Sequence, residues 1–311
     1  MWKALWWHGR KCALMPSSYV TKINLTEIKA IDIHVHVEID THGHLALDSE
    51  LMDASAKYFK VGPTHSRTPS IKEIAELYRS LSMAAVIFTV DAQTATGHEP
   101  LANEEIAEVA AENADVVIPF GSVDPWKDDA AKKMRVLVEN HGVKGFKFHP
   151  SLQAFTPNER KFYPIYEVLQ ELGVVALFHT GQTGIGAGLP GGRGIKLGYS
   201  NPILLDDVAA DFPELQIVLA HPSVPWVDTA ISMAIHKANV FIDLSGWLPK
   251  YFPQQLVAQA GNLLKDKLLF GTDFPLIAPE RWLTSFESLD ISPESTSKIL
   301  KTNAASLLKL S

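Results

Sequence analysis

The sequence predicts an α/β fold, a distorted (β/α)₈ TIM-type barrel with an insertion after the first strand. Eight apolar runs of strand length recur between residues 30 and 273. Most of them precede a longer segment with helical periodicity rather than a second strand, which is typical of a parallel sheet. The chain has 311 residues, and such barrels have roughly 200 to 400. A doubly wound open sheet is the competing arrangement.

The predicted strands are short runs rich in β-branched, aromatic and other apolar residues. In chain order they cover residues 30–37, 84–90, 116–123, 145–149, 174–179, 216–221, 240–244 and 268–273. The predicted helices cover residues 71–81, 103–114, 129–140, 158–172, 202–211, 227–236 and 253–264. Several helices begin with a capping residue or an early proline and end near a glycine, as helix ends require.

Two connections are longer than ordinary links between a strand and a helix. The first, residues 38–83, is the insertion after strand one. Its polar loop contains His42, His44, His65 and Arg67. The second, residues 180–201, is rich in glycine. In a barrel both segments lie over the carboxyl ends of the strands, where substrates bind.

The domain organisation follows from these elements. We expect residues 1–28 to be an N-terminal extension and residues 29–311 to form one barrel domain, with the insertion over its mouth. The single cysteine, Cys12, can form neither an intrachain disulfide nor a thiolate cluster, so nitrogen and oxygen atoms would hold any metal. This cysteine usage fits a cytoplasmic protein.

Charge and hydropathy exclude two classes of partner. Lys plus Arg number 28 and Asp plus Glu 35, a net charge of −7, and no basic stripe is present to neutralise a phosphate backbone. No apolar run approaches the roughly 18 residues that span a bilayer. We therefore expect a small-molecule substrate and no nucleic-acid or membrane partner. The helical segment 71–81 leaves a homodimer open.

The chemistry is predicted at the ends of the strands. In strand one, Asp32, His34 and His36 alternate with apolar residues, and strand alternation sends these three side chains to one face. Two imidazoles are therefore expected to project together from the end of this strand. A single histidine at a strand end is more often a structural residue with a hydrogen bond, so this pair alone establishes no site.

Three later strands also end at candidate ligands. His179 ends the fifth strand, His221 ends the sixth and Asp273 ends the eighth. A closed barrel brings these ends to one mouth. Imidazole nitrogens with one carboxylate oxygen suit one divalent metal, first of all Zn²⁺, with Mn²⁺, Fe²⁺ or Co²⁺ also compatible. Such an ion would activate water near neutral pH.

The same residues carry a resemblance. The order of these residues along the chain resembles that of the amidohydrolase superfamily: His-x-His at the end of strand one, single histidines at the ends of strands five and six, and an aspartate at the end of strand eight. The segments DIHVH, FHTG, LAHPS and FGTDFP are similar to its amidohydrolase-related branch, which includes 2-amino-3-carboxymuconate 6-semialdehyde decarboxylase and the resorcylate decarboxylases. The resemblance covers residues 30–310, and the order of the set is more specific than any one motif.

The resemblance implies a role for each residue. His34, His36, His179 and Asp273 would surround the metal, and His221 would be the acid/base residue that polarises water or the substrate. Asp273 would be a ligand, a proton shuttle or both. The branch generally holds one metal, whereas binuclear members of the superfamily bridge two metals with a carboxylated lysine on strand four.

Further residues are candidates for substrate contact. Strand four places Lys147 and His149 on one face. With one metal, Lys147 would act as a buried cation toward Asp273 or an anionic substrate, and a structural ion pair is the alternative. The glycine-rich loop lacks the P-loop lysine and the spacing of a dinucleotide fingerprint. Arg193 in this loop and Arg281 after strand eight are instead candidate anchors for a carboxylate or phosphate, although each alone is more often a solvated surface cation.

Core packing is the default role of Trp247 and the other aromatic residues at or beyond strand ends, but several of them on one rim would suit an aromatic or flat conjugated substrate. The predicted function is a metal-dependent hydrolase that activates water for attack on a carbonyl of a small acidic, aromatic or keto-containing substrate, with hydrolysis of a carbon–carbon bond included. The alternative reaction is metal-dependent non-oxidative decarboxylation, which uses the same ligands. A hypothesis of another class is a catalytically silent barrel that serves as a binding or scaffold subunit.

Overall fold

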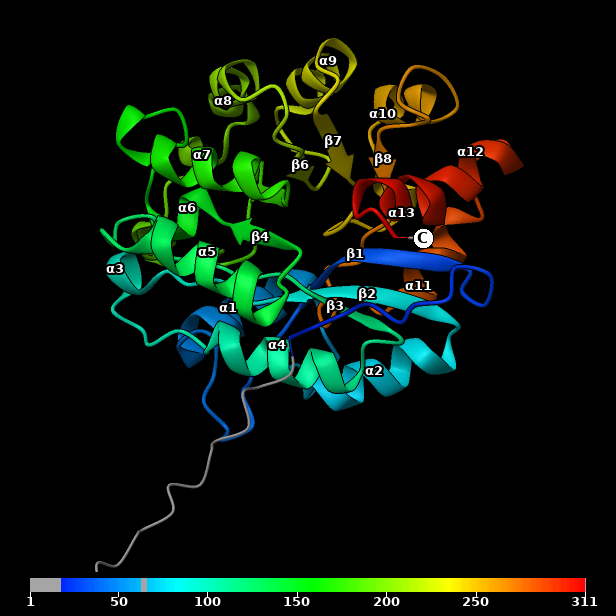
Figure 1. Ribbon diagram of the computed structural model, residues 1–311. Helices are drawn as coiled ribbons and strands as arrows, with labels where there is room; N and C mark the ends of the chain where they lie inside the picture. Colours follow the sequence, from blue (N-terminus) through cyan, green and yellow to red (C-terminus); the bar gives the residue numbers. More distant parts are fainter. Residues whose placement is uncertain (1–17, 63–65, 311) are drawn as a thin grey trace, which may run out of the picture.

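The computed structural model describes residues 18–62 and 66–310, and this part of the chain forms the expected TIM-type barrel. Its strands lie in the middle and its helices surround them (Figure 1). The eight strands of these residues are β1 (Ala30–His36), β2 (Met83–Phe88), β3 (Val117–Pro119), β4 (Gly145–Phe148), β5 (Val175–His179), β6 (Ile217–Ala220), β7 (Val240–Asp243) and β8 (Leu268–Leu269).

The strands form two parallel sheets, in the orders β1-β2-β3 and β4-β5-β6-β7-β8, and short contacts close them into one barrel. On one side, Gly121 beyond β3 pairs with Phe146 of β4. On the other, Val35 of β1 pairs with Phe274 beyond β8, and the His36 amide donates to the Phe274 carbonyl at 2.7 Å. The ring therefore closes, whereas a doubly wound sheet leaves two open edges.

β8 is shorter than the strand predicted over residues 268–273, and the reason bears on the site. From Phe270 onward the chain bonds to β1. The Ile33 amide donates to the Phe270 carbonyl at 3.0 Å, and the Asp273 amide donates to the His34 carbonyl at 2.9 Å. This change of partner brings Asp273 beside the end of β1.

The helices cover the outside of the barrel (Figure 1). They are α1 (Ser49–Phe59), α2 (Ile71–Ser80), α3 (Gln93–Thr96), α4 (Asn103–Glu112), α5 (Ala130–His141), α6 (Pro150–Gln153), α7 (Tyr163–Leu172), α8 (Asp206–Asp211), α9 (Val227–His236), α10 (Gln254–Ala260), α11 (Pro279–Phe286), α12 (Pro293–Ser297) and α13 (Asn303–Leu307). Short 3₁₀ turns are η1 (Arg160–Phe162), η2 (Pro190–Gly194), η3 (Leu197–Ser200), η4 (Pro202–Leu205) and η5 (Pro249–Tyr251), and η6 (Lys298–Thr302) is a π-helical turn.

The insertion holds a helix that the sequence pattern did not predict, α1. It begins after Asp48, whose side chain accepts a hydrogen bond from the Leu51 amide. Only four of its 11 residues are buried, so its apolar stripe is too narrow to stand out from the polar loop around it. The helix predicted over residues 71–81 is present as α2.

Two clusters of apolar side chains make the core. One takes alternate residues from several strands, among them Ile31 and Ile33 of β1 and Val218 of β6, and fills the barrel. Ile23, Ile28 and side chains of α13 join this cluster and close the barrel at the amino ends of the strands. The larger cluster lies between the strands and the surrounding helices.

The described residues that precede β1 pack against the barrel. Tyr19 is 2% exposed, and its amide donates to the His141 carbonyl at the end of α5 at 3.0 Å. The described part of the expected extension, residues 18–28, is therefore in contact with the barrel. Two residues singled out from the sequence lie outside the described ranges: Cys12 and His65.

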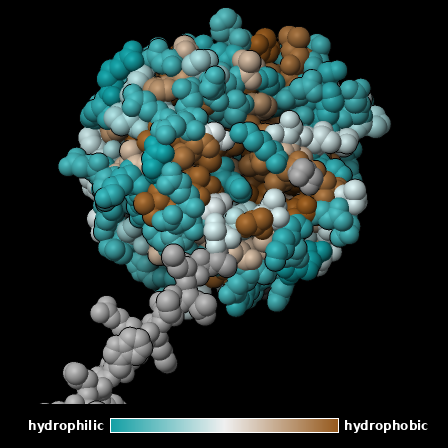
Figure 2. Space-filling view, in the orientation of Figure 1, coloured by the Kyte–Doolittle hydropathy of each residue, from teal (hydrophilic) through white to brown (hydrophobic). Residues whose placement is uncertain are grey.

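Most of the face seen in Figure 2 is hydrophilic, with apolar side chains gathered in a few places near its middle. Within residues 18–62 and 66–310, no helix is both long enough and apolar enough to cross a membrane.

Candidate metal centre

Three potential metal ligands meet at the carboxyl ends of the strands. His34 Nε2, His36 Nε2 and Asp273 Oδ1 lie 3.1 to 3.2 Å from one another. In the described part of the chain they are the one group of such side chains whose ligand atoms converge. The side chain of His34 is fully buried and that of His36 is 15% exposed. Two nitrogens and one carboxylate oxygen at these separations suit a divalent metal.

The closure of the barrel between β1 and the segment after β8 produces this convergence. The hydrogen bond from the Asp273 amide to the His34 carbonyl, 2.9 Å long, holds the two residues side by side. Asp273 has a φ of 70° and His221 a φ of 71°, in the left-handed region that residues other than glycine rarely adopt. Such conformations persist where the surrounding bonds enforce them, and they cluster at functional sites.

His179 at the end of β5 contacts His221, which follows β6. His221 Nε2 lies 2.9 Å from His179 Nδ1. The other nitrogen of His179, Nε2, is buried and has no hydrogen-bond partner among the described residues. A buried polar atom without a hydrogen-bond partner is rare in proteins, so we expect a bound group to contact this nitrogen. The donor set and this nitrogen therefore fit a divalent metal, and His179 is a candidate fourth protein ligand.

The protonation states of His36, His179, His221 and Asp273 also suit metal binding. Burial lowers the pKa of His36 and of His221 to about 4, and it lowers the pKa of His179 well below the ordinary value. Burial raises the pKa of Asp273, but the close contacts with the imidazoles of His34 and His36 outweigh this and hold it well below its usual range. Neutral imidazoles and an ionised carboxylate are the forms that bind a metal. For His34, burial lowers the pKa, but the charge of Asp243 and the contacts with Asp243 and Asp273 outweigh it and raise the pKa above its ordinary value.

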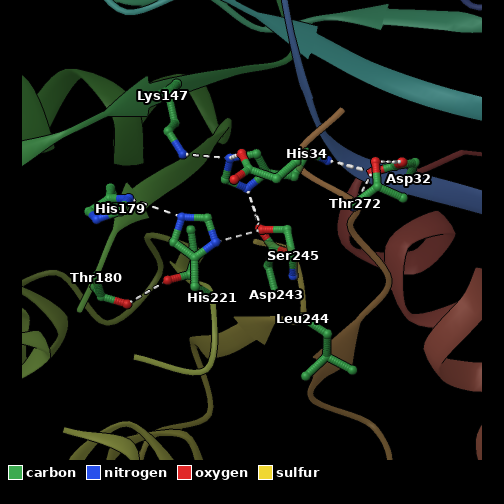
Figure 3. A network of polar contacts seen from close by, with 12 residues as sticks. Asp32, His34, Lys147, His179, Thr180, His221, Asp243, Leu244, Ser245 and Thr272 are labelled. Atoms are coloured by element: carbon green, nitrogen blue, oxygen red, sulfur yellow. Dashed lines mark hydrogen bonds and ion pairs between the residues drawn. The ribbon is translucent and has the colours of Figure 1, made fainter. Parts of the chain in front are cut away.

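Two residues at the end of β7 complete the site, and sequence reasoning missed both. Asp243 Oδ2 lies 2.5 Å from His34 Nδ1, an arrangement that orients a histidine ligand. Ser245 Oγ lies 2.9 Å from His34 Nδ1 and 2.9 Å from His221 Nδ1 (Figure 3). Strand alternation already places residues 243 and 245 on one face, but the segment contains no histidine to draw attention to it.

Asp32 does not join this group, which corrects the expectation that it shares a face with His34 and His36. The pairing register of β1 shifts just after Asp32, so the alternation of side chains breaks there. Asp32 instead accepts hydrogen bonds from Tyr78 of α2 and from the Thr272 hydroxyl, each at 2.6 Å. These bonds tie β1 to α2 and to the segment after β8.

Lys147 of β4 and the next residue along that face, His149, lie beside the ligand group. Lys147 is 1% exposed, and its Nζ is 3.0 Å from His34 Nε2. Burial lowers the pKa of Lys147 to about 8. The His149 ring stacks on the His179 ring, with centroids 3.8 Å apart. His149 Nδ1 accepts from the Leu152 amide at 3.2 Å, so the neutral ring carries its hydrogen on Nε2.

A cavity of about 980 Å³, part of it open to solvent, lies over these residues. Its polar end is formed by side chains at the carboxyl ends of the strands: His36, Lys147, His149, His179, His221 and Asp273. The remaining wall is largely apolar or aromatic and includes Met52, Phe59, Leu152, Ile185, Trp247 and Leu276. Residues of the insertion and of the glycine-rich loop thus both line the cavity.

Two cations considered as substrate anchors lie elsewhere. Arg193 pairs with Asp48 and Glu50 at the start of α1, and it links the glycine-rich loop to the insertion. Arg281 is exposed on α11. Neither of these two arginines lines the cavity, whereas Trp247 does.

Comparison with known proteins identifies a matching family and solved structures of similar fold. The family described as amidohydrolase matches residues 39–310. An uncharacterised TIM-barrel protein from Bordetella bronchiseptica is 22% identical, with a TM-score of 0.74 over 91% of this chain and 99% of its own. The 5-carboxyvanillate decarboxylase of Sphingomonas paucimobilis is 14% identical, with a TM-score of 0.64 over 91% and 100%.

A third solved structure is the dihydroxybenzoic acid decarboxylase of a Polaromonas species, with bound manganese and the inhibitor 2-nitroresorcinol. It is 19% identical, with a TM-score of 0.65 over 91% of this chain and 97% of its own. At these identities the likeness concerns the fold. No curated protein sequence matches the chain.

Proposed function

Because this chain belongs to the amidohydrolase family, we propose that it is a metal-dependent non-oxidative decarboxylase of a small aromatic carboxylic acid. The observation that carries the proposal is that the cavity has a polar end and a largely apolar wall. One end has the proposed ligands His36, His179 and Asp273 and the buried Lys147, and much of the remaining wall is apolar or aromatic. A carboxylate suits the polar end and a flat ring suits the apolar wall.

Decarboxylation takes precedence over the hydrolysis that the sequence analysis favoured. Both reactions use the same ligands, so the ligand set does not separate them. Two solved structures of similar fold are decarboxylases of hydroxylated benzoic acids, which supports decarboxylation. One of them contains manganese, so Mn²⁺ stands beside Zn²⁺ as a metal to test.

In the proposed reaction, His34, His36, His179 and Asp273 hold the metal. The bound ion supplies positive charge that neutralises and orients the oxygen atoms of the substrate. The ammonium group of Lys147 adds a second cation at the same end of the cavity. The ring of the substrate packs against the apolar wall, which excludes water from the reacting carbon.

The bond between the ring and the carboxyl carbon then breaks. CO₂ leaves, and the electron pair of that bond stays on the ring carbon, which takes one proton. Because Asp273 is ionised, this proton comes from solvent. We assign its transfer to Asp273 Oδ2, which takes up a proton from solvent and passes it to the ring carbon, because Oδ1 faces His34 and His36. Both ring nitrogens of His221 already contact His179 and Ser245. We therefore assign His221 the role of orienting the ligand His179 rather than of delivering the proton.

The proposal is tested with the purified chain loaded with Mn²⁺ or Zn²⁺ and a panel of hydroxybenzoic acids labelled with ¹³C at the carboxyl carbon. We expect labelled CO₂, measured by ¹³C NMR, and in D₂O one deuterium on the ring carbon that lost it. Asp273→Asn should abolish both signals. Chelation with EDTA should stop turnover, and added metal should restore it.

A second panel of esters, lactones and β-diketones in H₂¹⁸O covers the competing reaction. ¹⁸O in a product without CO₂ release would replace decarboxylation by hydrolysis. A chain that binds metal stoichiometrically yet turns over neither panel would favour the binding or scaffold subunit.

A further inference from the structure

Ser245 lies at the centre of the site, and its hydroxyl takes no part in the proposed reaction. Its Oγ lies 2.9 Å from His34 Nδ1 and from His221 Nδ1, and 3.0 Å from Asp243 Oδ2 (Figure 3). The residue is fully buried. We propose that Ser245 is a positioning residue. Together with Asp243 it determines which ring nitrogen of His34, His221 and His179 carries hydrogen, and so which nitrogen of His34 and His179 can bind the metal.

The direction of the hydrogen bonds follows from Asp243. A carboxylate has only acceptor sites, so His34 Nδ1 and Ser245 Oγ both donate to Asp243 Oδ2. The other carboxylate oxygen accepts from the Ser245 amide at 2.7 Å. A hydroxyl has a single hydrogen. Since Ser245 gives it to Asp243, its oxygen accepts from the Nδ1 hydrogen of His221.

The same reasoning extends to His179. A neutral imidazole with hydrogen on Nδ1 has its lone pair on Nε2. His221 Nε2 therefore accepts from His179 Nδ1, 2.9 Å away. His179 in turn has its lone pair on Nε2, the buried nitrogen that no described residue contacts by a hydrogen bond. His34, with hydrogen on Nδ1, likewise turns the Nε2 lone pair toward the ligand group.

Two glycines leave the space that this chain of hydrogen bonds occupies. A Cβ on Gly246 would lie 2.6 Å from His221 Nδ1, and the φ of Gly246 is +72°. A Cβ on Gly271 would overlap the carboxylate of Asp243. Real Cβ atoms do not approach other atoms so closely, so the backbone itself is shaped around the imidazole and the carboxylate.

This inference rests on the metal site of the proposed function but not on the reaction catalysed there. Its measurements therefore use no substrate. If the chain proves to catalyse hydrolysis, or no reaction at all, the inference is still tested by the experiments below.

The tautomers are measured by long-range ¹H–¹⁵N NMR on metal-free protein with ¹⁵N-labelled histidines at pH 7.5. We expect the Nδ1–H form for His34, His179 and His221. His149 serves as the internal contrast with the Nε2–H form, because its Nδ1 accepts from the Leu152 amide. Histidine in water favours Nε2–H, so three Nδ1–H rings form a distinctive pattern. Hydrogen on Nε2 of His179 would overturn the proposal.

The Ser245→Ala variant removes the link between Asp243 and His221. His34 keeps its bond to Asp243, whereas the Nδ1 hydrogen of His221 loses its acceptor and the tautomers of His221 and His179 become mixed. We expect Mn²⁺ affinity, measured by calorimetry, to fall about 10- to 100-fold, the usual effect of losing a group that orients a ligand. Ser245→Thr keeps the hydroxyl and should restore the tautomers and most of the affinity.

Ser223→Ala is the matched control. Ser223 is also fully buried beside His221, but its hydroxyl contacts Thr180 Oγ1 at 2.7 Å and the His221 carbonyl at 3.4 Å rather than a ring. We expect it to leave Mn²⁺ affinity and the ring tautomers unchanged. Unchanged tautomers and affinity in Ser245→Ala would overturn the proposal. If that variant does not fold, the wild-type tautomers and Ser245→Thr decide the question.

Discussion

Removing the hydroxyl of Tyr78 should destabilise the barrel more than removing the hydroxyls of two other tyrosines. Tyr78 OH donates to Asp32 Oδ2 at 2.6 Å, and both side chains are fully buried. A hydrogen bond to a charged group contributes about 1.5–3 kcal/mol, and water cannot reach this carboxylate to replace the donor. We therefore expect Tyr78→Phe to lower the free energy of unfolding by about 1.5–3 kcal/mol.

Two further tyrosines separate the effects of burial and charge. Tyr166 OH donates to the Pro157 carbonyl at 2.9 Å and is also buried, so Tyr166→Phe should cost about 0.5–1.5 kcal/mol, the range for a neutral acceptor. Tyr163 OH donates to Asp211 Oδ2 at 2.8 Å. Because the Asp211 side chain is 40% exposed, water replaces the donor, and Tyr163→Phe should cost less than about 1 kcal/mol.

The assay is equilibrium urea unfolding of metal-free protein at pH 7.5, followed by tryptophan fluorescence and by circular dichroism. Coincident transitions by the two probes establish that a single unfolding free energy is defined, and equal m values allow the variants to be compared. The reasoning would be refuted by equal losses in all three variants, or by the largest loss in Tyr163→Phe.

Three other predictions concern the metal and the surface. His179→Ala removes a proposed ligand and His221→Ala only a group behind it, so metal content by elemental analysis should fall further in the first; equal losses would contradict this assignment. Mn²⁺ at 100 times its Kd should raise the unfolding free energy by about 2.7 kcal/mol, and an unchanged melting temperature would argue against a metal site in the folded state. Hydrogen bonds from Arg79 hold the pKa of Asp115 below its usual range, so this pair stabilises the fold above the unfolded pKa and loses that contribution as pH falls through the folded pKa. Asp115→Asn should cost less than about 1 kcal/mol at pH 7 and nothing in strong acid, and a cost that persists there would contradict the ion pair.

The architecture could be predicted because its signals are local. Each strand is a short apolar run, and each following helix has its own caps and periodicity, so the order of elements can be read without knowing any contact. The places of His34, His179 and Asp273 follow from that order, because a parallel barrel brings the carboxyl ends of all strands to one mouth.

What could not be predicted depends on pairing between distant strands. The register shift in β1 separates Asp32 from His34, and it arises from how β1 pairs with β2. Ser245 acquires its place only because β7 lies beside β6 and its end faces β1. A serine carries no chemical signal of its own in a sequence, and its partners are 211 residues away in one case and 24 in the other.

The ligand group spans one of the two places where the two sheets of the barrel meet. His34 and His36 belong to the three-stranded sheet, whereas His179 belongs to the five-stranded one and Asp273 to the segment that follows it. Few backbone bonds join the two sheets there, among them the one from the Asp273 amide to the His34 carbonyl. A cation held by these side chains would therefore link the two sheets directly. Metal binding and closure of the barrel should thus stabilise each other, because each fixes the same pair of chain segments.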